Sequence, residues 1–370
     1  MENLKIALLF HFYQPWWQFP AVLHKIVNQC YGPILGLVNG SDRFCFTVNV
    51  NLSLLELLDS SFPDVVTGFK EAAEKGKIEL MGSPAQHPIF PLIPEFLQRS
   101  QIKNDKEDKE KRFGLRQNCK GFYLPEMGFS RNDIGLMKEF GYRWSVTDDE
   151  PFRAIHGSVP CDNIIILNGF KTYMRSSLWS NLISSGNFSF ADIKARMEYE
   201  IPSWTKNAPA YLIIAMDAET FGHHHEGLIE RFLKPMLQEW GGERIVPIES
   251  LELSFPWRSV SYLPDSSWST SADDVRKNDP YPLWNSRFNR YHSMLWELTN
   301  IALKYFKDCE QDCLKMTSSC HWWWISGRPH WEPEFMKFGA KKAIEIIRKY
   351  GTLDEREVAE NLYKELKELH

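Results

Sequence analysis

The amino-acid sequence predicts an α/β fold in which parallel strands form an incomplete or distorted barrel, followed by a helical region. Short apolar runs alternate with helical segments over residues 1–260, which is typical of βαβ units. About seven such runs precede residue 250, and that number suits an incomplete barrel better than an open sheet. From residue 283 onward the periodicity is helical. We therefore expect one region over residues 1–260 and a second, helical region over residues 261–370.

The composition excludes several classes of protein. A net charge of −5 gives no reason to expect nucleic acid or an anionic membrane as a partner. No apolar run approaches the ~18 residues that cross a membrane. The first ten residues lack a cleavage-site pattern and read as a first strand, and the seven cysteines suggest no disulfide framework, so we expect a cytoplasmic protein. The aromatic content of 14%, with 14 Trp, predicts a large core or a cleft for a flat ligand face.

The strands are predicted from apolar runs that end at turn residues or polar residues. They cover residues 5–10, 44–50, 77–81, 121–124, 143–147, 211–216 and 244–247. The stretches 163–167 and 173–179 lie between the runs 143–147 and 211–216. Residues 82–94 contain four Pro, which excludes a helix or a central strand and predicts a rigid loop.

The helices are predicted from amphipathic periodicity and from Gly or Pro at their ends. They cover residues 22–37 with a break at Gly32-Pro33, then 52–58, 63–75, 95–112, 130–140, 192–201, 229–239, 284–306, 334–350 and 354–370. Both signs of charge alternate in residues 95–112, which predicts a solvated helix face. Residues 256–281 are rich in Ser, Asp and Pro, and we interpret them as a long connection that marks the boundary between the two regions.

Two carboxylates directly follow predicted buried strands. Asp217 comes after the apolar run 211–216, and Glu126 comes after Pro125, which ends the run 121–124. In a barrel of parallel strands this end carries the chemistry. A pair of acids there can supply one proton donor and one nucleophile or base, although either acid alone could instead cap the next helix.

Further polar and aromatic residues are candidates for a ligand site. A strand-end His followed by Gln, Pro and two Trp resembles a site wall, and the Pro-rich loop contains one more His. A run of three Trp in the helical region either fills the seam against the barrel or forms a cleft wall. The residues concerned are His11, Gln14, Trp16, Trp17, His87, Trp322, Trp323 and Trp324.

Three groups of residues invite a metal interpretation. Asp148-Asp149-Glu150 end a predicted strand but lack a partner His spacing, so we expect a solvated or hydrogen-bonding role. Residues 223–225 are consecutive His, which cannot all point at one ion in regular structure. Cys309 and Cys313 with Cys320-His321 match no zinc-finger or ribbon spacing. We therefore expect no metal site.

Five segments, in order, give the chain a resemblance to glycoside hydrolase family 57 over roughly nine tenths of its length. Residues 11–15 (His-Phe-Tyr-Gln-Pro) are similar to the first motif, with Tyr13 where the family usually has a second His. Residues 79–88 resemble the second motif. Residues 121–126 (Gly-Phe-Tyr-Leu-Pro-Glu) and 217–223 (Asp-Ala-Glu-Thr-Phe-Gly-His) resemble the third and fourth, which are the specific ones. The cluster 322–324 falls where the fifth motif contributes aromatics.

The resemblance implies a (β/α)7 barrel whose C-terminal face is covered by a helical region, with no metal and no organic cofactor. It implies that Glu126 is the nucleophile and Asp217 the general acid/base of a retaining mechanism, with carboxyls roughly 5–5.5 Å apart. This mechanism requires a raised pKa at Asp217 and an ordinary one at Glu126. Glu219 is the next candidate for the acid. We also expect His11, His87 and His223 to bond sugar hydroxyls and the Trp residues to stack on sugar faces.

The expected activity is hydrolysis of α-1,4 linkages in an α-glucan, as in an α-amylase. A 4-α-glucanotransferase or a branching enzyme would use the same two acids, because transfer differs only in what attacks the glycosyl-enzyme. Two alternatives belong to other classes: a metal-dependent polysaccharide deacetylase on a similar barrel, and a glucan-binding relative without catalysis. The expected partner is the α-glucan, and the sequence does not define linkage, chain-length preference or oligomeric state.

Overall fold

Seven parallel strands form a closed ring in the computed structural model, which describes residues 3–41, 45–114, 119–206, 208–242 and 244–370. The strands follow one another around the ring in the order β3-β2-β1-β8-β7-β5-β4. Their bounds are β1 Leu4–Phe12, β2 Phe46–Val50, β3 Ile78–Leu80, β4 Gly121–Phe122, β5 Trp144–Asp148, β7 Phe170–Arg175 and β8 Ala210–Asp217. Most residues of these strands are buried, which explains why they read as continuous apolar runs. The predicted barrel is confirmed.

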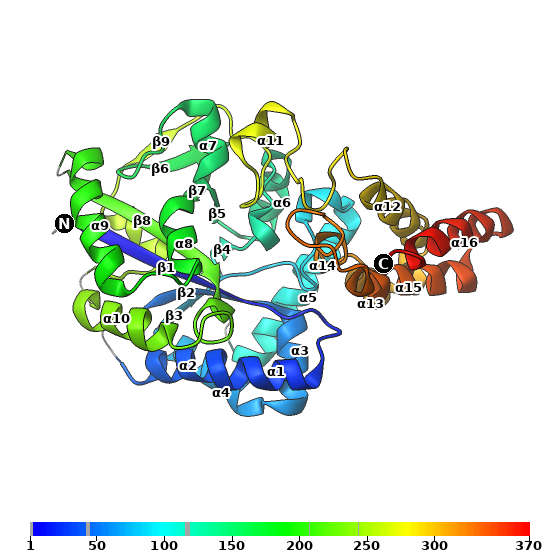
Figure 1. Cartoon of the computed structure of the whole chain (residues 1–370), viewed down its shortest axis with the longest axis horizontal. Helices are drawn as coiled ribbons and strands as arrows, with labels where there is room; N and C mark the ends of the chain where they lie inside the picture. The colour runs from blue at the N-terminus through cyan, green and yellow to red at the C-terminus, as the bar shows by residue number, and fades with distance from the viewer. Residues whose placement is uncertain (1–2, 42–44, 115–118, 207, 243) are drawn as a thin grey trace.

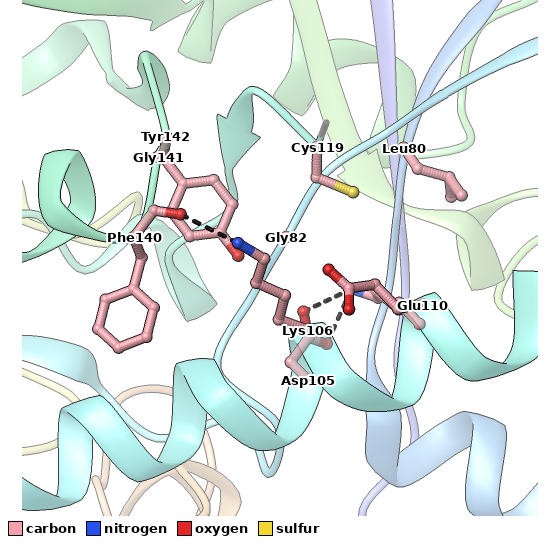
Figure 2. A pocket seen from close by; sticks show the side chains of 10 residues that line it. Leu80, Gly82, Asp105, Lys106, Glu110, Cys119, Phe140, Gly141 and Tyr142 are labelled. Atoms are coloured by element: carbon pink, nitrogen blue, oxygen red, sulfur yellow. Dashed lines mark hydrogen bonds and ion pairs between the residues drawn. The ribbon is translucent and has the colours of Figure 1, made fainter. Parts of the chain in front are cut away.

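Backbone contacts of Gly82, just after β3, close the ring against β4. The N–H of Gly82 donates to the carbonyl of Gly121 at 3.0 Å, and the N–H of Tyr123 donates to the carbonyl of Gly82 at 2.8 Å. A Cβ on Gly82 would lie 2.3 Å from the hydroxyl oxygen of Tyr142, so only glycine fits at this seam. Figure 2 shows Gly82 beside the Tyr142 ring at a small cavity of about 90 Å³.

The first helical segment does not break at Gly32-Pro33 as the sequence predicts. Helix α1 (Pro20–Ile26) continues through a π-helical turn (Val27–Tyr31) into α2 (Gly32–Asn39). Pro33 stands in the first turn of α2, where its missing N–H costs least. The wider π-helical turn before it accommodates the proline, so the helix continues.

The remaining helices of the barrel region surround the strands (Figure 1). They are α3 Leu52–Ser61, α4 Pro63–Glu74, α5 Glu95–Phe113, α6 Ile134–Glu139, α7 Asp149–His156, α8 Ser177–Ser184, α9 Phe190–Thr205 and α10 Lys234–Trp240. The face of α5 is not fully solvated, because Lys109 and Asp105 form a buried ion pair at 2.8 Å. Lys109 also donates to the carbonyl of Met81, which ties α5 to the end of β3.

Several strand predictions need correction. Residues 244–247 form only an isolated bridge, Ile245 to Ile6, because β2 takes over beside β1 from Leu9 onward. Residues 163–167 correspond to β6 (Ile164–Leu167), which runs antiparallel to β7 and, with β9 (Trp257–Ser259), lies outside the ring. The stretch 173–179 spans the end of β7 and the start of α8. The predicted start of the second strand, Phe44, lies outside the described residues.

The C-terminal helices have a hydrophobic core of their own and lie beyond the end toward which β1 points (Figure 1). They are α12 Arg290–Leu303, α13 Glu310–Met316, α14 Cys320–Trp323, α15 Pro333–Tyr350 and α16 Leu353–Lys367. The first of them begins at Arg290, later than predicted, because the Asn289 side chain caps its N-terminus. The region thus lies over the C-terminal face of the strands, as expected. Among the described residues no helix is both long and apolar enough to cross a membrane.

Candidate active site

Glu126 and Asp217 lie at the C-terminal ends of two barrel strands. Asp217 is the last residue of β8, and Glu126 stands in a 3₁₀ turn (Pro125–Met127) that follows β4. The backbone of Glu126 adopts φ 58° and ψ 17°, a left-handed conformation that a non-glycine residue seldom adopts. Such local strain is held in place by the surrounding structure and is concentrated at functional sites.

Both acids face one cavity of about 670 Å³ between the barrel and the C-terminal helices. Its polar lining comes from strand ends and its aromatic lining mainly from the loop after β1 and from the helical region. The predicted site residues that line it are His11, Gln14, Trp17, Glu126, Asp217, Glu219, His223, Trp323 and Trp324. Residues that are far apart in the sequence therefore line one cavity.

Two neutral groups act on Glu126. The indole Nε1 of Trp268 donates to its Oε2 at 2.8 Å, and the side chain of Ser319 lowers the pKa of the carboxyl as a hydrogen-bonding group. The pKa of Glu126 is raised to about 8, because burial and the negative charge of Asp217 raise it by more than Trp268 and Ser319 lower it. The expectation of an ordinary pKa at Glu126 is therefore wrong for the unliganded site, because the acid lies in a desolvated cleft with a second carboxylate.

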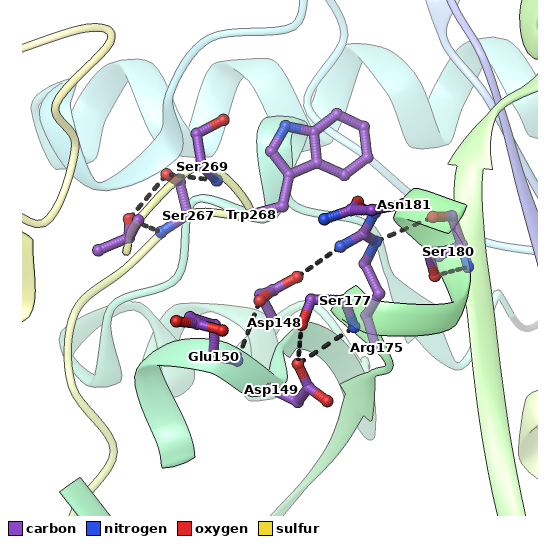
Figure 3. Close-up of polar contacts among 12 residues, drawn as sticks. Asp148, Asp149, Glu150, Arg175, Ser177, Ser180, Asn181, Ser267, Trp268 and Ser269 are labelled. Atoms are coloured by element: carbon purple, nitrogen blue, oxygen red, sulfur yellow. Dashed lines mark hydrogen bonds and ion pairs between the residues drawn. The ribbon is translucent and has the colours of Figure 1, made fainter. Parts of the chain in front are cut away.

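Asp217 shares its surroundings with a buried guanidinium. Burial raises the pKa of Asp217, as expected for the acid, and the positive charge of Arg175 lowers it. The Arg175 side chain donates to Asp148 Oδ2 at 2.7 Å and to the carbonyl of Ala215 at 2.9 Å, and it lies over the Trp268 ring at 5.6 Å (Figure 3). Arg175 thus joins the two strand ends β7 and β5 beside the candidate acid.

Glu219 is a third carboxylate of this cluster. Gln14 Nε2 donates to Glu219 Oε1 at 2.8 Å, and the hydroxyl of Tyr31 donates to the same oxygen. Burial raises the pKa of Glu219, and the charge of Asp217 raises it further. Gln14 therefore contacts Glu219 in the unliganded site.

His11 and His87 form a stacked pair at the barrel end. The Nε2 atoms of the two rings lie 2.9 Å apart, and burial lowers the pKa of both, so both are neutral near pH 7. The ring of Tyr13 stacks on His87 with centroids 3.7 Å apart, while its hydroxyl bonds Ser318 and Cys320. His11 lines the cavity, whereas His87 lies behind it and is not among the lining residues.

The tryptophans divide between the cleft and the seam. Trp17, Trp323 and Trp324 line the cavity. Trp322 does not: it is 1% exposed and stacks on Trp296 in the helical core, with centroids 4.0 Å apart. Trp16 does not line the cavity either.

The indole of Trp16 instead donates to the carbonyl of Lys315 and joins the loop after β1 to α13. Within the run 322–324, neighbouring residues point in different directions. Trp322 therefore fills the seam, whereas Trp323 and Trp324 form part of the cleft wall.

The groups with a metal interpretation are engaged in other contacts. Asp148 is buried, caps α7 and pairs with Arg175, so its role is hydrogen bonding. His223 bonds Gln29, and His225 bonds the carbonyl of Ser184. Across the described part of the chain, no three His, Cys, Asp or Glu side chains are arranged to hold a metal ion.

Three residues of the site escape sequence reasoning. Arg175 is the last residue of β7, a strand that was not predicted. A search for charged residues at strand ends would identify Arg175 once that strand is known. Trp268 lies in the segment interpreted as a connection, and Ser319 lies in a short turn before α14. No local pattern marks either, because each reaches Glu126 from a distant part of the chain.

Comparison with known proteins shows the family of the chain. The sequence model of glycosyl hydrolase family 57 matches residues 10–264. The chain belongs to glycosyl hydrolase family 57. An alpha-amylase of Pyrococcus abyssi is 24% identical over 152 residues, which are 41% of this chain and 23% of that protein. One of Pyrococcus horikoshii is 25% identical over 152 residues, 41% of this chain and 24% of that protein. The match thus spans about a quarter of these curated relatives.

Solved structures of this family share the fold of the chain. A 4-alpha-glucanotransferase from Thermococcus litoralis superposes with a TM-score of 0.76 at 16% identity, over 95% of this chain and 60% of that chain. A GH57-type branching enzyme from Pyrococcus horikoshii superposes with a TM-score of 0.71 at 13% identity, over 99% of this chain and 95% of that one. At such identities the likeness concerns the fold.

Proposed function

We propose that this family 57 chain is a retaining glycoside hydrolase that cleaves α-1,4 linkages of an α-glucan, as an α-amylase does. The observation that carries the proposal is the meeting of Glu126 and Asp217 in one cavity walled by indole rings. Carboxyl pairs at such positions supply the nucleophile and the acid of glycoside cleavage, and flat aromatic faces suit sugar rings.

In the proposed mechanism, Glu126 attacks the anomeric carbon while Asp217 protonates the leaving oxygen. Asp217 then removes a proton from the water that releases the sugar. The productive state has the charge on Glu126 and the proton on Asp217. The charge of Asp217 raises the pKa of Glu126, so the ionisation of one acid affects the other, and Trp268 and Ser319 favour placing the charge on Glu126.

The substrate-binding roles follow from the cavity lining. We propose that Trp17, Trp323 and Trp324 stack on sugar rings, and that His11, His223 and Glu219 bond hydroxyl groups. We also propose that residues 1–260 form the catalytic barrel and that residues 261–370 complete the cleft, which fits the separate hydrophobic cluster of the C-terminal helices. A cytoplasmic location fits seven cysteines of which none forms a disulfide.

Glucan transfer is the second candidate, as in a 4-α-glucanotransferase or branching enzyme. It needs the same two acids and an acceptor sugar in place of water. The observation that favours it is a second hollow of about 660 Å³, which shares Trp268 with the first cavity and is also lined by polar residues such as Asn181 and Asn187. A further glucan chain has room there. A metal-dependent deacetylase needs a ligand group that the described residues do not form.

Product analysis with maltoheptaose tests the proposal. Shorter sugars alone, unaffected by a chelator and lost in Glu126→Gln, indicate hydrolysis. A ladder of longer and shorter sugars indicates transfer. The absence of any product, with branched glucans also unchanged, contradicts both. The deacetylase alternative is tested with acetylated sugars, from which it would release acetate in a chelator-sensitive reaction.

The roles of the two acids are tested separately with azide and an α-maltosyl fluoride substrate. In Asp217→Ala, azide should attack the glycosyl-enzyme and yield an α-glycosyl azide. In Glu126→Ala, azide should replace the nucleophile and yield the β-anomer. The reverse pattern would exchange the two roles. Release of β-configured sugar by the unaltered enzyme, seen by NMR, would mean inversion.

A further inference from the structure

A chain of buried hydrogen bonds runs from strand β2 to the candidate nucleophile. The ring Nδ1 of His11 lies 2.8 Å from Asn49 Oδ1, the Nε2 atoms of His11 and His87 lie 2.9 Å apart, and Nδ1 of His87 lies 2.8 Å from Ser319 Oγ. The side chain of Ser319 also acts on Glu126, because it lowers the pKa of that carboxyl as a hydrogen-bonding group. Each of the first four residues is at most 3% exposed, so water does not compete for these contacts.

The two rings fix each other's tautomers. Both histidines are neutral, so each carries one N–H. Since their Nε2 atoms face each other, one of the two must carry the shared proton and the other must accept it. Every hydrogen bond of the chain then points in the same direction. The direction is set by the hydrogen-bond network as a whole.

In the first direction the chain points away from Glu126. His11 donates to Asn49, His87 donates to His11, and the hydroxyl of Ser319 donates to His87. Ser319 then has no proton left for Glu126, so this direction suits a protonated carboxyl that donates to the hydroxyl. It also leaves Nδ2 of Asn49 buried without a partner among the described residues.

In the second direction the chain points toward Glu126. A turned amide of Asn49 donates to Nδ1 of His11, His11 donates to His87, His87 donates to Ser319, and the hydroxyl donates to the carboxylate. The orphaned Nδ2 gains a partner, and the amide oxygen that takes its place is the less costly group to leave unpaired. This direction suits an ionised Glu126.

Among the described residues, no cation is one of the groups that shift the pKa of Glu126. The titratable groups that act on it or feel its charge are Asp217 at the end of β8, Tyr13 after β1, Tyr123 after β4 and Cys320 in α14. All of these are acids, and the cation Arg175 acts on Asp217. The anion therefore depends on neutral donors.

We propose that Asn49, His11, His87 and Ser319 are positioning residues that act as one directional hydrogen-bond chain and donate to Glu126 when it is ionised. The direction of these hydrogen bonds reverses when Glu126 is protonated. The tautomers of the two histidines therefore follow the charge state of the nucleophile, and the hydrogen bonds stabilise it. The proposal rests on the proposed function only in calling Glu126 the nucleophile. The left-handed backbone of His87, with φ 58°, fits a residue held in place for such a contact.

The direct test is ¹⁵N NMR of the full chain with labelled histidines, assigned by single replacements. Above the pH at which Glu126 ionises, we expect the proton on Nε2 of His11 and on Nδ1 of His87. A proton on Nδ1 of His11 and Nε2 of His87 at every pH overturns the proposal. This measurement needs no activity, so its failure is distinct from failure of the proposed function.

Kinetics provide the second test. Ser319→Ala should move the limb of kcat/KM that reports Glu126 to higher pH by roughly one to two units, because a donor to the anion is lost. Ser319→Thr keeps the hydroxyl and should leave the limb in place. Thr317→Val removes a nearby buried hydroxyl that bonds helix carbonyls, and it should not move the limb. An equal loss of kcat/KM at all pH values in Ser319→Ala would indicate a structural role and overturn the proposal.

Discussion

The indole Nε1 of Trp268 donates a hydrogen bond of 2.8 Å to Oε2 of Glu126, although 142 residues separate the two in sequence. The backbone is joined as well, since the N–H of Trp268 donates to the carbonyl of Glu126 at 3.0 Å. A segment that looks like a connection in the sequence thus holds the candidate nucleophile from outside the barrel. Its contacts hold that carboxyl in position and lower its pKa.

Trp268→Phe removes the indole donor and keeps most of the ring. Because a hydrogen bond to the ionised form is lost, the pKa of Glu126 should rise, and the limb of kcat/KM that reports Glu126 should move to higher pH. We expect kcat/KM below that limb to fall about tenfold or more. Trp257→Phe, at an exposed position of β9, is the control. An unmoved limb in Trp268→Phe would show that the bond does not act on the charge of Glu126.

Removal of the Arg175 charge should act on the other limb. The guanidinium lowers the pKa of Asp217, so its loss raises that pKa and keeps Asp217 protonated to higher pH. The limb of kcat/KM that reports Asp217 should therefore move to higher pH. Arg175→Met is combined with Asp148→Asn, because Arg175→Met alone leaves a buried charge unpaired. Arg153→Met, which breaks a partly exposed pair with Asp149, should leave this limb in place. A downward shift in the double variant would contradict the assignment of Asp217 as the acid.

The strand ends were predictable because their signal is local. Asp217 follows its own buried strand, and Glu126 follows Pro125, so neighbouring residues in the sequence reveal that both stand at the same barrel end. The partners that set their charge were not predictable. Trp268 and Ser319 come from turns whose course depends on packing between the helical region and the barrel.

The Trp cluster shows the same limit. The sequence indicates three aromatic residues at helical positions, and it leaves open which face is buried. Trp322 packs into the helical core whereas Trp323 faces the cavity, and only the contact with α12 decides this. The pKa of Glu126 is a similar case, because burial is a property of the assembled cleft.

Trp322 and Trp323 should separate stability from binding. Trp322→Ala creates a large cavity in the helical core and should cost about 3–5 kcal/mol of unfolding free energy. Trp323→Ala should have a smaller effect on stability, because the side chain is partly exposed, and should raise KM for maltoheptaose. Denaturant unfolding and steady-state kinetics on both variants test this. A larger KM effect for Trp322→Ala than for Trp323→Ala would contradict the division between core and cleft.

Gly82→Ala should open the seam of the barrel. The added Cβ would lie 2.3 Å from the hydroxyl oxygen and 2.6 Å from Cζ of Tyr142, and the backbone at Gly82 is held by two hydrogen bonds to β4 and its following residue. We expect a loss of about 3 kcal/mol or more in denaturant unfolding. Tyr142→Ala should recover part of this loss in the double variant. Gly135→Ala in α6, where a Cβ meets nothing within 4 Å, is the matched control and should be neutral or stabilising. Equal losses at both glycines would show that the contact with Tyr142 is not the cause.

Replacement of Glu126 should stabilise the fold at alkaline pH. Its pKa is raised to about 8 in the folded chain from 4.5, so between these values the folded state binds more protons than the unfolded state, and stability falls as pH rises. Glu126→Gln removes this dependence. We expect its Tm to exceed that of the unaltered chain by roughly 2–4 °C at pH 8 and by less at pH 5. The surface variant Glu95→Gln, at an exposed ion pair with Arg99, should show no such gain on going to pH 8. A Tm gain for Glu126→Gln that is equal at both pH values would mean that the buried charge of Glu126 does not destabilise the fold.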